Sequence, residues 1–510
     1  MTDTSSNNKR LAKNTLFLYF RTIVILLISL YTSRVVLQAL GEVDFGIYNL
    51  VGGIVVLFSF MNGALSTATQ RYLSYELGKS DEREANHIFC MSLSIHILLS
   101  AFVLILGETI GLWFVETQLN IPEERNSAAF WVYQFSLIGC CASILRVPFS
   151  AVIVAYENFS FYTYTSVLDA ILRLAIVFAL FLFIIDKLVL YAILMCFVIF
   201  VFIIIYYFYC TTNYSICRYK FIWDRSLFRE LLSFSGWSMF GSFANISANQ
   251  GLNMLLNIFC GVILNAAVGI ATQVQGALAS FIYSFQSPLS PQIVKAYASN
   301  DRKYFFDLIS NSSRLSYALV FIFGPAIIVC LDPILSVWLT TVPKYTKQIV
   351  TLYILFVMID AMSGPLWISV QATGNIRTYQ MLMSILILLN LPIMMFLLYL
   401  RVSPVIVVAV RPILNLLTHL IRIVYLKRNI LFPSRKYWKD VMLRCMIMSI
   451  LCLPLSLFLM ERLNDRSYFW GLVAFAAIVI QNAILVMVVG IKSGEREAIF
   501  RFVYNRLPIR

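Results

Sequence analysis

The sequence predicts an all-α polytopic membrane protein with about fourteen transmembrane helices. Three observations predict this class: the composition, the length of the apolar segments and the distribution of positive charge. Of the 510 residues, 60% are hydrophobic and only 13% are charged, with a mean hydropathy of +0.82. A soluble globular chain carries roughly 25% charged residues. This chain is too poor in charge to cover itself with a water-facing surface, and a lipid bilayer removes that requirement.

The apolar segments have the length that a membrane span requires, because a bilayer core needs about 20 apolar residues per helix. The approximate spans are residues 14–36, 46–68, 87–107, 128–153, 163–186, 188–210, 233–259, 265–290, 312–332, 347–371, 379–400, 404–426, 441–461 and 468–491. The first apolar run follows a basic segment, but it is too long for a signal peptide and lacks a small-residue cleavage site. We therefore expect an uncleaved first span.

Positive charge gives the orientation of these spans. An even number of spans places both termini on the same side of the membrane. The net charge is +14, and most lysines and arginines fall in the loops on the side of the termini. Cytoplasmic loops carry such an excess, so both termini are predicted to be cytoplasmic. The basic charge therefore reflects topology and predicts no nucleic-acid partner.

The chain also contains a weak internal repeat. Residues 146–162 align without gaps on residues 363–379. The matching pairs are Pro148 and Pro365, Ala155 and Ala372, Asn158 and Asn375, and Tyr162 and Tyr379. A second match, at a slightly different offset, pairs Gly46, Ile47 and Gly53 with Gly269, Ile270 and Gly276. Six spans separate the copies, which predicts two six-helix lobes related by a pseudo-two-fold axis along the membrane normal. The predicted domains are 1–212, 213–432, and an appendage of two helices and a cytoplasmic tail, 433–510.

Four of the arginines within the predicted spans are candidates for a substrate site: Arg21, Arg146, Arg173 and Arg411. Charged residues at membrane depth are costly and usually face a cavity or a partner. One interpretation is a cationic cavity for an anionic head group, because the planar guanidinium donates paired hydrogen bonds to phosphate. The alternatives are snorkelling for Arg21, as for Arg422, and a structural ion pair between Arg173 and Asp169, four residues earlier on the same helix.

A polar stripe follows one face of the seventh span. Its members recur at steps of three or four residues: Ser238, Ser242, Asn245, Asn249, Asn253 and Asn257. Such a stripe would be costly in lipid, so we expect it to contact a hydroxyl-rich glycan in a cavity, with Asn49 of the second span as a further candidate. Packing between helices is the alternative. Asp360 and Asp169 are candidates for an ion-coupling site.

The sequence gives little support for an enzyme or a metal protein. Ten cysteines form no CxxC pair, and three histidines are scattered along the chain. We therefore expect no metal site, no cofactor and no catalytic residues. A glycan polymerase or ligase with many spans usually carries a large periplasmic loop, and the outer loops here are short.

Two segments resemble a known family. Residues 32–53 contain Leu40-Gly41 and Phe45-Gly46, and residues 65–79 contain the turn Gln70-Arg71. Both resemble the Wzx-type polysaccharide flippases. These belong to the multidrug/oligosaccharidyl-lipid/polysaccharide (MOP, MATE-like) superfamily, with the multidrug and toxin extruders and the lipid II flippase. The resemblance covers the first five spans well and extends more loosely to about the twelfth span.

The resemblance implies a function in surface polysaccharide (O-antigen, lipopolysaccharide) biosynthesis. Such a flippase moves an undecaprenyl-pyrophosphate-linked oligosaccharide from the cytoplasmic to the periplasmic leaflet of the bacterial inner membrane by alternating access. The matching cationic candidates are Arg21, Arg146, Arg173 and Arg411. The expected partners are the lipid-linked glycan, membrane lipid and a polysaccharide polymerase. The main alternative is a cation-coupled multidrug extruder of the same fold, which would favour acids and aromatic residues over arginines in its cavity.

Overall fold

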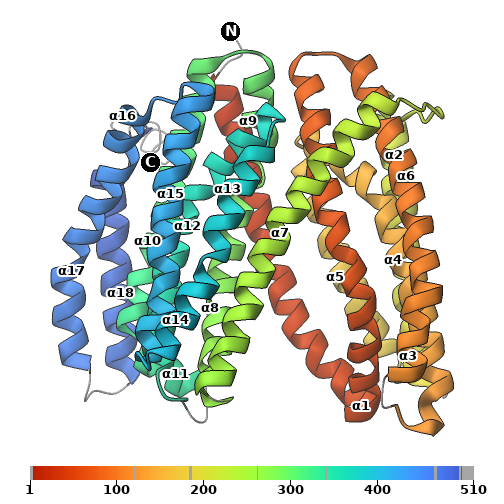
Figure 1. Cartoon of the computed structure of the whole chain (residues 1–510), viewed down its shortest axis with the longest axis horizontal. Helices are drawn as coiled ribbons and strands as arrows, with labels where there is room; N and C mark the ends of the chain where they lie inside the picture. The colour runs from red at the N-terminus through yellow and green to blue at the C-terminus, as the bar shows by residue number, and fades with distance from the viewer. Residues whose placement is uncertain are drawn as a thin grey trace, which may run out of the picture. The chain divides into compact units, whose positions relative to one another are not determined.

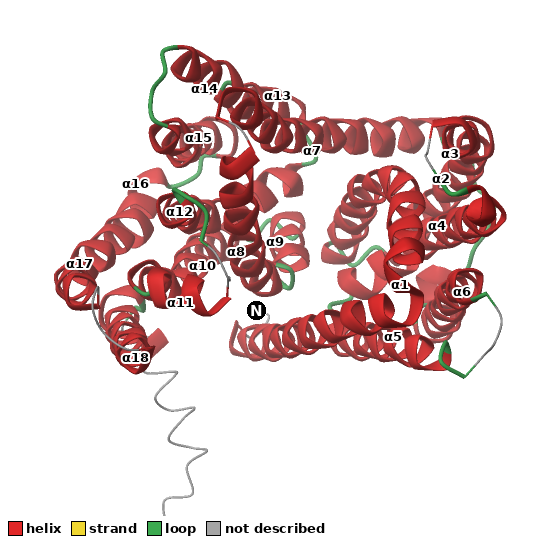
Figure 2. Ribbon diagram, turned by 90° about the horizontal axis from the view of Figure 1, so that it is seen from below, coloured by secondary structure: helices red, strands yellow, loops and turns green. Residues whose placement is uncertain are grey.

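The computed structural model describes residues 4–118, 121–182, 186–260, 262–338, 342–463, 468–492 and 495–496; within α1, α3, α7, α8, α17 and α18 some side chains also lie outside the description. Over these ranges the backbone forms helices joined by short turns, and none of them contains a strand (Figures 1 and 2). The predicted all-α membrane class is confirmed.

Ten helical segments in the described residues are long and apolar enough to cross a membrane. The four remaining predicted spans also lie on helical backbone, two of them in α1 and one each in α7 and α8. The total of fourteen spans and the cytoplasmic position of both termini stay predictions.

The contacts divide the chain into two compact units. Unit 1 comprises Met1–Met239, Pro288–Asp301 and Gly374–Ile376, and unit 2 comprises Phe240–Ser287, Arg302–Thr373 and Arg377–Arg510. The boundary after residue 239 falls inside α7. The predicted domains 1–212, 213–432 and 433–510 were defined by the sequence repeat, whereas these units are defined by packing, so the domains stay a prediction.

Unit 1 is built around α4, which packs against α1, α2 and α6, while α1 also packs against α5 and α9. Its helices are α1 (Thr4–Gly78), α2 (Glu82–Leu106), α3 (Leu112–Gln118), α4 (Asn126–Ala155), α5 (Phe159–Ala179), α6 (Lys187–Asn213), the first part of α7 (Arg225–Cys260) and α9 (Leu289–Ala298).

Helix α1 consists of two arms that meet at Gly41 (Figure 1). This residue has φ 79° and ψ 171°, a conformation that favours glycine because a Cβ would clash with the backbone. The two predicted spans of this region are the two arms. Close to the break, Arg125 donates hydrogen bonds to Asp44 (2.8 Å from Nε) and Asp186 (2.7 Å from Nη1). This ion cluster ties the second arm of α1 to the starts of α4 and α6.

Unit 2 is centred on α12, which packs against α8, α10 and α15, while α10 also packs against α17 and α18. Its helices are the rest of α7, α8 (Val262–Gln286), α10 (Arg302–Val329), α11 (Leu331–Trp338), α12 (Thr346–Thr373), α13 (Arg377–Leu388), α14 (Asn390–Tyr399), α15 (Pro404–Ile430), α16 (Ser434–Tyr437), α17 (Leu443–Leu463) and α18 (Tyr468–Leu485).

The two aligned segments of the sequence repeat fold alike. Pro148 lies inside α4 and Pro365 inside α12. A left-handed residue follows each helix, Glu157 with φ 62° and Gly374 with φ 79°, and the next helix begins within three residues. The turns that the alignment pairs are therefore equivalent in backbone conformation as well as in sequence.

A buried charge fastens the last part of the chain to α10. Arg314 is fully buried, and its Nη2 donates to both carboxylate oxygens of Glu495 at 2.7 and 2.6 Å. Asn482 of α18, also fully buried, donates to the carbonyl of Phe321 at 3.0 Å. These polar contacts fix α18 and the segment after it against α10.

We predict that Glu495→Ala lowers the thermal stability of the purified protein, because it leaves the buried Arg314 guanidinium without its carboxylate partner. Loss of one partner of a buried ion pair costs roughly 3 kcal/mol. The matched control is Lys436→Met, which breaks an exposed pair with Asp307 and should cost less than about 1 kcal/mol. Thermal unfolding in detergent compares the two, and an equal effect would contradict the prediction.

Candidate functional site

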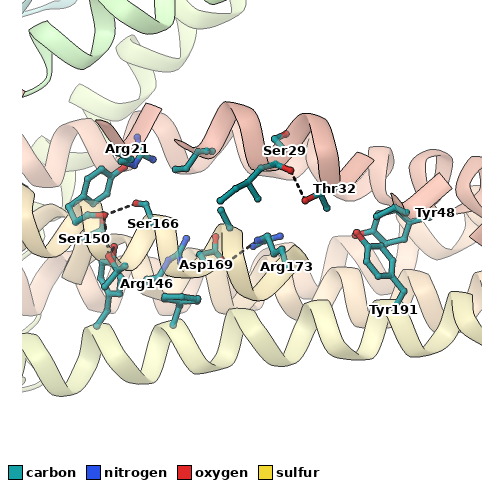
Figure 3. Close-up of a pocket in the computed structure, with 18 residues that line it drawn as sticks. Arg21, Ser29, Thr32, Tyr48, Arg146, Ser150, Ser166, Asp169, Arg173 and Tyr191 are labelled. Atoms are coloured by element: carbon teal, nitrogen blue, oxygen red, sulfur yellow. Dashed lines mark hydrogen bonds and ion pairs between the residues drawn. The ribbon is translucent and has the colours of Figure 1, made fainter. Parts of the chain in front are cut away.

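Unit 1 contains a pocket of about 530 Å³ between α1, α4, α5 and α6 (Figure 3). Its lining includes three of the four predicted arginines, Arg21, Arg146 and Arg173, together with Asp169. Three separate helices supply the arginines: α1, α4 and α5. Residues far apart in the sequence thus meet in one pocket.

Helical periodicity explains how two apolar helices present polar side chains to this pocket. On α5 the lining residues Tyr162, Ser166, Asp169 and Arg173 follow one another at steps of four, three and four residues. On α1 the lining residues Arg21, Ile25, Ile28, Ser29, Thr32 and Val36 keep the same helical spacing. Residues at such steps share one face of a helix. Each helix therefore directs one stripe into the pocket.

The pocket lining is net positive, with three arginines and one aspartate among its residues. The predicted pairing along α5 is confirmed, since Arg173 Nε lies 3.0 Å from Asp169 Oδ1. Arg21 and Arg146 have no carboxylate partner among the described residues. Their guanidinium groups instead lie over aromatic rings, 4.8 Å from the Tyr162 centroid and 5.5 Å from the Tyr206 centroid.

The two ends of the pocket differ in chemistry. In Figure 3, Arg21, Arg146 and Ser150 lie toward one end, Asp169 and Arg173 lie near the middle, and Tyr48 and Tyr191 lie at the other end. The rings of Tyr48 and Tyr191 meet edge to face with centroids 4.8 Å apart. The hydroxyl-bearing residues that line the pocket are Ser29, Thr32, Tyr48, Ser150, Tyr162, Thr165, Ser166, Tyr191 and Tyr206. The lining thus offers cations at one end and hydroxyl groups along its length.

The fourth arginine, Arg411, belongs to unit 2 and not to this pocket. Its Nη2 donates to Asn249 Oδ1 at 2.6 Å, and its guanidinium lies 4.6 Å from the Tyr353 ring and 4.5 Å from the Phe356 ring. Two rings and one amide therefore orient this cation. The sequence predicts one set of four arginines. In the structure, three of them line the pocket of unit 1, and the fourth belongs to unit 2.

The polar stripe of α7 is partly described. Asn245 and Asn249 are exposed, and each donates its amide to the carbonyl four residues earlier, at 2.9 and 2.8 Å. This leaves the oxygen of Asn249 directed to Arg411. The side chains of Asn253 and Asn49 lie outside the described residues.

Asp360 lies in the middle of α12, yet its side chain is exposed. Its neighbours Met358 and Ala361 are buried. The charged groups that act on the Asp360 carboxylate are Arg422 and Arg411. Across the described residues the structure records no hydrogen bond or ion pair for it. Asp360 is therefore a carboxylate at membrane depth on which the charges of two arginines act.

Reasoning from the sequence missed the aromatic residues of the pocket, Tyr48, Tyr162, Tyr191 and Tyr206. The helical spacing of Tyr162 with Asp169 and Arg173 could have indicated the first, but tyrosines are frequent in this chain. The sequence offers only snorkelling for Arg422, and the structure adds that its charge acts on the Asp360 carboxylate. Within the described residues no three His, Cys, Asp or Glu side chains are grouped as metal ligands.

No protein-family model matches the chain, and no curated protein sequence matches it. Solved structures do match. A mutant MATE transporter of Vibrio cholerae gives a TM-score of 0.70 at 15% identity, over 84% of this chain and 98% of its own. A MOP-superfamily transporter of Pyrococcus furiosus gives 0.69 at 11% identity, over 83% and 96%. An outward-facing multidrug resistance MATE transporter gives 0.66 at 13% identity, over 82% and 94%. The chain therefore has the fold of the MATE and other MOP-superfamily transporters, which are multi-pass membrane proteins.

The electrostatics of the pocket can be tested without knowing its ligand. We predict that Ser166→Cys reacts about tenfold faster with an anionic methanethiosulfonate than with a cationic one. Each rate is first divided by the rate of the same reagent with a free thiol in solution. Arg146→Ala should reduce this preference, and the matched control Arg229→Ala, which removes an exposed arginine of α7, should not. Mass spectrometry follows the reaction. A preference for the cationic reagent would contradict a net positive pocket.

Proposed function

We propose that this protein is a flippase that moves a polyprenyl-pyrophosphate-linked oligosaccharide from the cytoplasmic to the periplasmic leaflet of a bacterial inner membrane. The observation that carries the proposal is the pocket of unit 1, in which arginines outnumber carboxylates three to one. The proposed process is transport by alternating access and includes no chemical change of the substrate.

The chemistry of the pocket suits a pyrophosphate. Arginine stays charged at physiological pH, and its planar fork donates paired hydrogen bonds to phosphate oxygens. Arg21 and Arg146 come from two different helices and have no carboxylate partner in the described part of the chain, so both can bind an anion. Because Asp169 already accepts from Arg173, the third arginine is the less available one.

The size and lining of the pocket favour a head group over a whole substrate. A volume of about 530 Å³ lies in the range of about 300–1,000 Å³ that small-molecule sites occupy. It can enclose a pyrophosphate and the sugar next to it, whereas the polyprenyl chain would remain in lipid. The hydroxyl groups along the pocket and the Tyr48–Tyr191 pair can hydrogen-bond and stack with that sugar.

The polarity of the pocket is the feature on which we favour the proposal over its main alternative. The Pyrococcus furiosus structure is described as having a binding pocket of reverse polarity, which suggests a different function for that transporter. For that transporter, the polarity of the pocket is thus the basis for suggesting a function. A cation-coupled multidrug extruder remains the second candidate, and the carboxylates of Asp169 and Asp360 are the features that it would use.

The test is translocation by purified protein in liposomes. We predict rapid transfer of a labelled polyprenyl-pyrophosphate oligosaccharide to the far leaflet, where a non-permeant reagent detects it. Arg146→Ala should slow this transfer about tenfold or more, because one charge-assisted contact to phosphate is lost. The matched control Arg229→Ala should transfer at the wild-type rate. Transfer of a cationic dye in place of the glycan would identify an extruder on the same fold.

Asp360 provides a separate prediction about coupling. If this exposed carboxylate binds the coupling ion, Asp360→Asn should abolish the dependence of transport on the proton or sodium gradient. Binding of the glycan to the pocket of unit 1 should persist in this variant, because Asp360 belongs to unit 2. Transport rates under imposed pH and sodium gradients measure this dependence. Transport that keeps its full response to both gradients would exclude Asp360 as the coupling site.

A further inference from the structure

Unit 1 contains two short segments from the second half of the chain, Pro288–Asp301 and Gly374–Ile376. The first segment holds α9, and the second follows α12. Both are connections between helices on the side that the charge distribution predicts to be cytoplasmic. Their packing with the first half is therefore a contact between the two repeats, made inside one compact unit.

Helix α9 and the end of α1 are equivalent parts of the two repeats. Each ends at a left-handed residue, Ser80 with φ 63° and Asn300 with φ 57°. The following amides, of Asp81 and Asp301, bond back to carbonyls five residues earlier, at 3.0 and 3.2 Å. The two helix ends thus have the same backbone geometry, and one constant difference in residue number relates them.

The same offset pairs residues that contact each other. Gln70 corresponds to Ser290, and its Nε2 lies 3.4 Å from the Ser290 Oγ. Gly78 corresponds to Ala298, and a Cβ added to Gly78 would lie 3.0 Å from the Ala298 Cβ. Contact between corresponding residues places this helix pair on the pseudo-two-fold axis.

The first cross-repeat contact is an ion pair at the turn between α4 and α5. The Glu157 side chain is 1% exposed, and its Oε1 accepts from Lys295 Nζ at 2.9 Å. Its Oε2 accepts from Gln292 Nε2 at 3.1 Å. Glu157 has a positive φ, which strains a side chain that glycine would not have, and the equivalent residue in the other repeat is Gly374. The strained position therefore holds a carboxylate that accepts from two side chains of α9, Gln292 and Lys295.

The second contact between the repeats is the equivalent one, between Arg71 and the turn at Gly374. Arg71, near the end of α1, is 8% exposed, and its Nη2 would lie 2.5 Å from a Cβ added to Gly374. The guanidinium is held over the rings of Tyr72 and Tyr75, at 4.3 and 4.9 Å from their centroids. Each repeat thus contacts the turn between two helices of the other repeat. Helix α9 contacts Glu157 between α4 and α5, and α1 contacts Gly374 between α12 and α13.

We propose that these two contacts form a latch, defined by Glu157, Gln292 and Lys295 on one side and Arg71 and Gly374 on the other, that holds the cytoplasmic entrance closed. The proposal rests on the alternating access of the proposed function, in which the two repeats must separate on this side to admit substrate. Both latch contacts join the repeats, so both must break in that step. Lys295 keeps 26% of its side chain exposed, so water can solvate its charge when the pair opens.

The latch is tested with a reporter cysteine at Ser74, which is fully buried and lies four residues from both Gln70 and Gly78 on the α1 face toward α9. Inside-out vesicles are treated with a membrane-impermeant maleimide, and labelling of the chain without the reporter is subtracted. We predict slow labelling of Ser74→Cys alone. Adding Glu157→Gly or Lys295→Met should raise the labelling rate about tenfold or more, because either removes the Glu157–Lys295 ion pair.

Two designs separate latch opening from unfolding. Glu157→Gly relieves the backbone strain and matches the other repeat, so it removes the carboxylate without a new steric cost. The exchanged pair Glu157→Lys with Lys295→Glu should return labelling toward the slow rate. Lys436→Met, which breaks the exposed pair with Asp307, is the matched control and should leave labelling unchanged.

Labelling that stays slow in both single variants would overturn the latch, and so would fast labelling that the exchanged pair does not reduce. These measurements report conformation and use no substrate. Failure of glycan transfer with fast labelling in the single variants would overturn the proposed function alone. Normal glycan transfer with unchanged labelling would overturn the latch alone.

Discussion

The free-energy cost of a charged group in hydrocarbon is the constraint on which the rest of this structure depends. An arginine at membrane depth has to meet water, a counter-charge or an aromatic face. The structure uses these solutions in different places. Arg173 is paired with Asp169, Arg21 and Arg146 lie over tyrosine rings beside a pocket, and Arg314 is buried against Glu495. The first three mark a cavity, whereas the last fastens helices together, so intramembrane charge alone does not distinguish a binding site from a structural contact.

The fold class could be predicted from the sequence because hydropathy acts locally. Each apolar run of sufficient length must form a helix, since lipid offers no partner for backbone N–H and C=O groups. The Asp169–Arg173 pair was predictable for the same reason, because a spacing of four residues fixes the contact within one helix. The repeat was also visible, since the turns at Glu157 and Gly374 keep both its sequence and its backbone conformation.

The site could be predicted only in part, because pockets depend on how helices pack. Nothing in the sequence places Arg146 of α4 in the same pocket as Arg21 of α1, or assigns Arg411 to the other unit. The rings of Tyr162 and Tyr206 were equally hidden, because each supports an arginine on a different helix. Asp360 was recognised as a lone carboxylate from its position in an apolar run, but its proximity to Arg422 required the packing of α12.

Helix α10 carries a serine-rich face that would be unusual for a helix surrounded by lipid. Ser310, Ser312, Ser313 and Ser316 are all buried beside the equally buried Arg314. Helices α17 and α18 pack against α10 and cover it, with Tyr317 bonded to Ser449 of α17 and Phe321 to Asn482 of α18. A shortened chain that lacked α17, α18 and the segment after them would leave Arg314 without Glu495 and Tyr317 without Ser449 on the uncovered side of α10. The last two helices are therefore part of the minimal folding unit of this chain, and a twelve-span version could not be obtained by truncation without also redesigning the surface of α10.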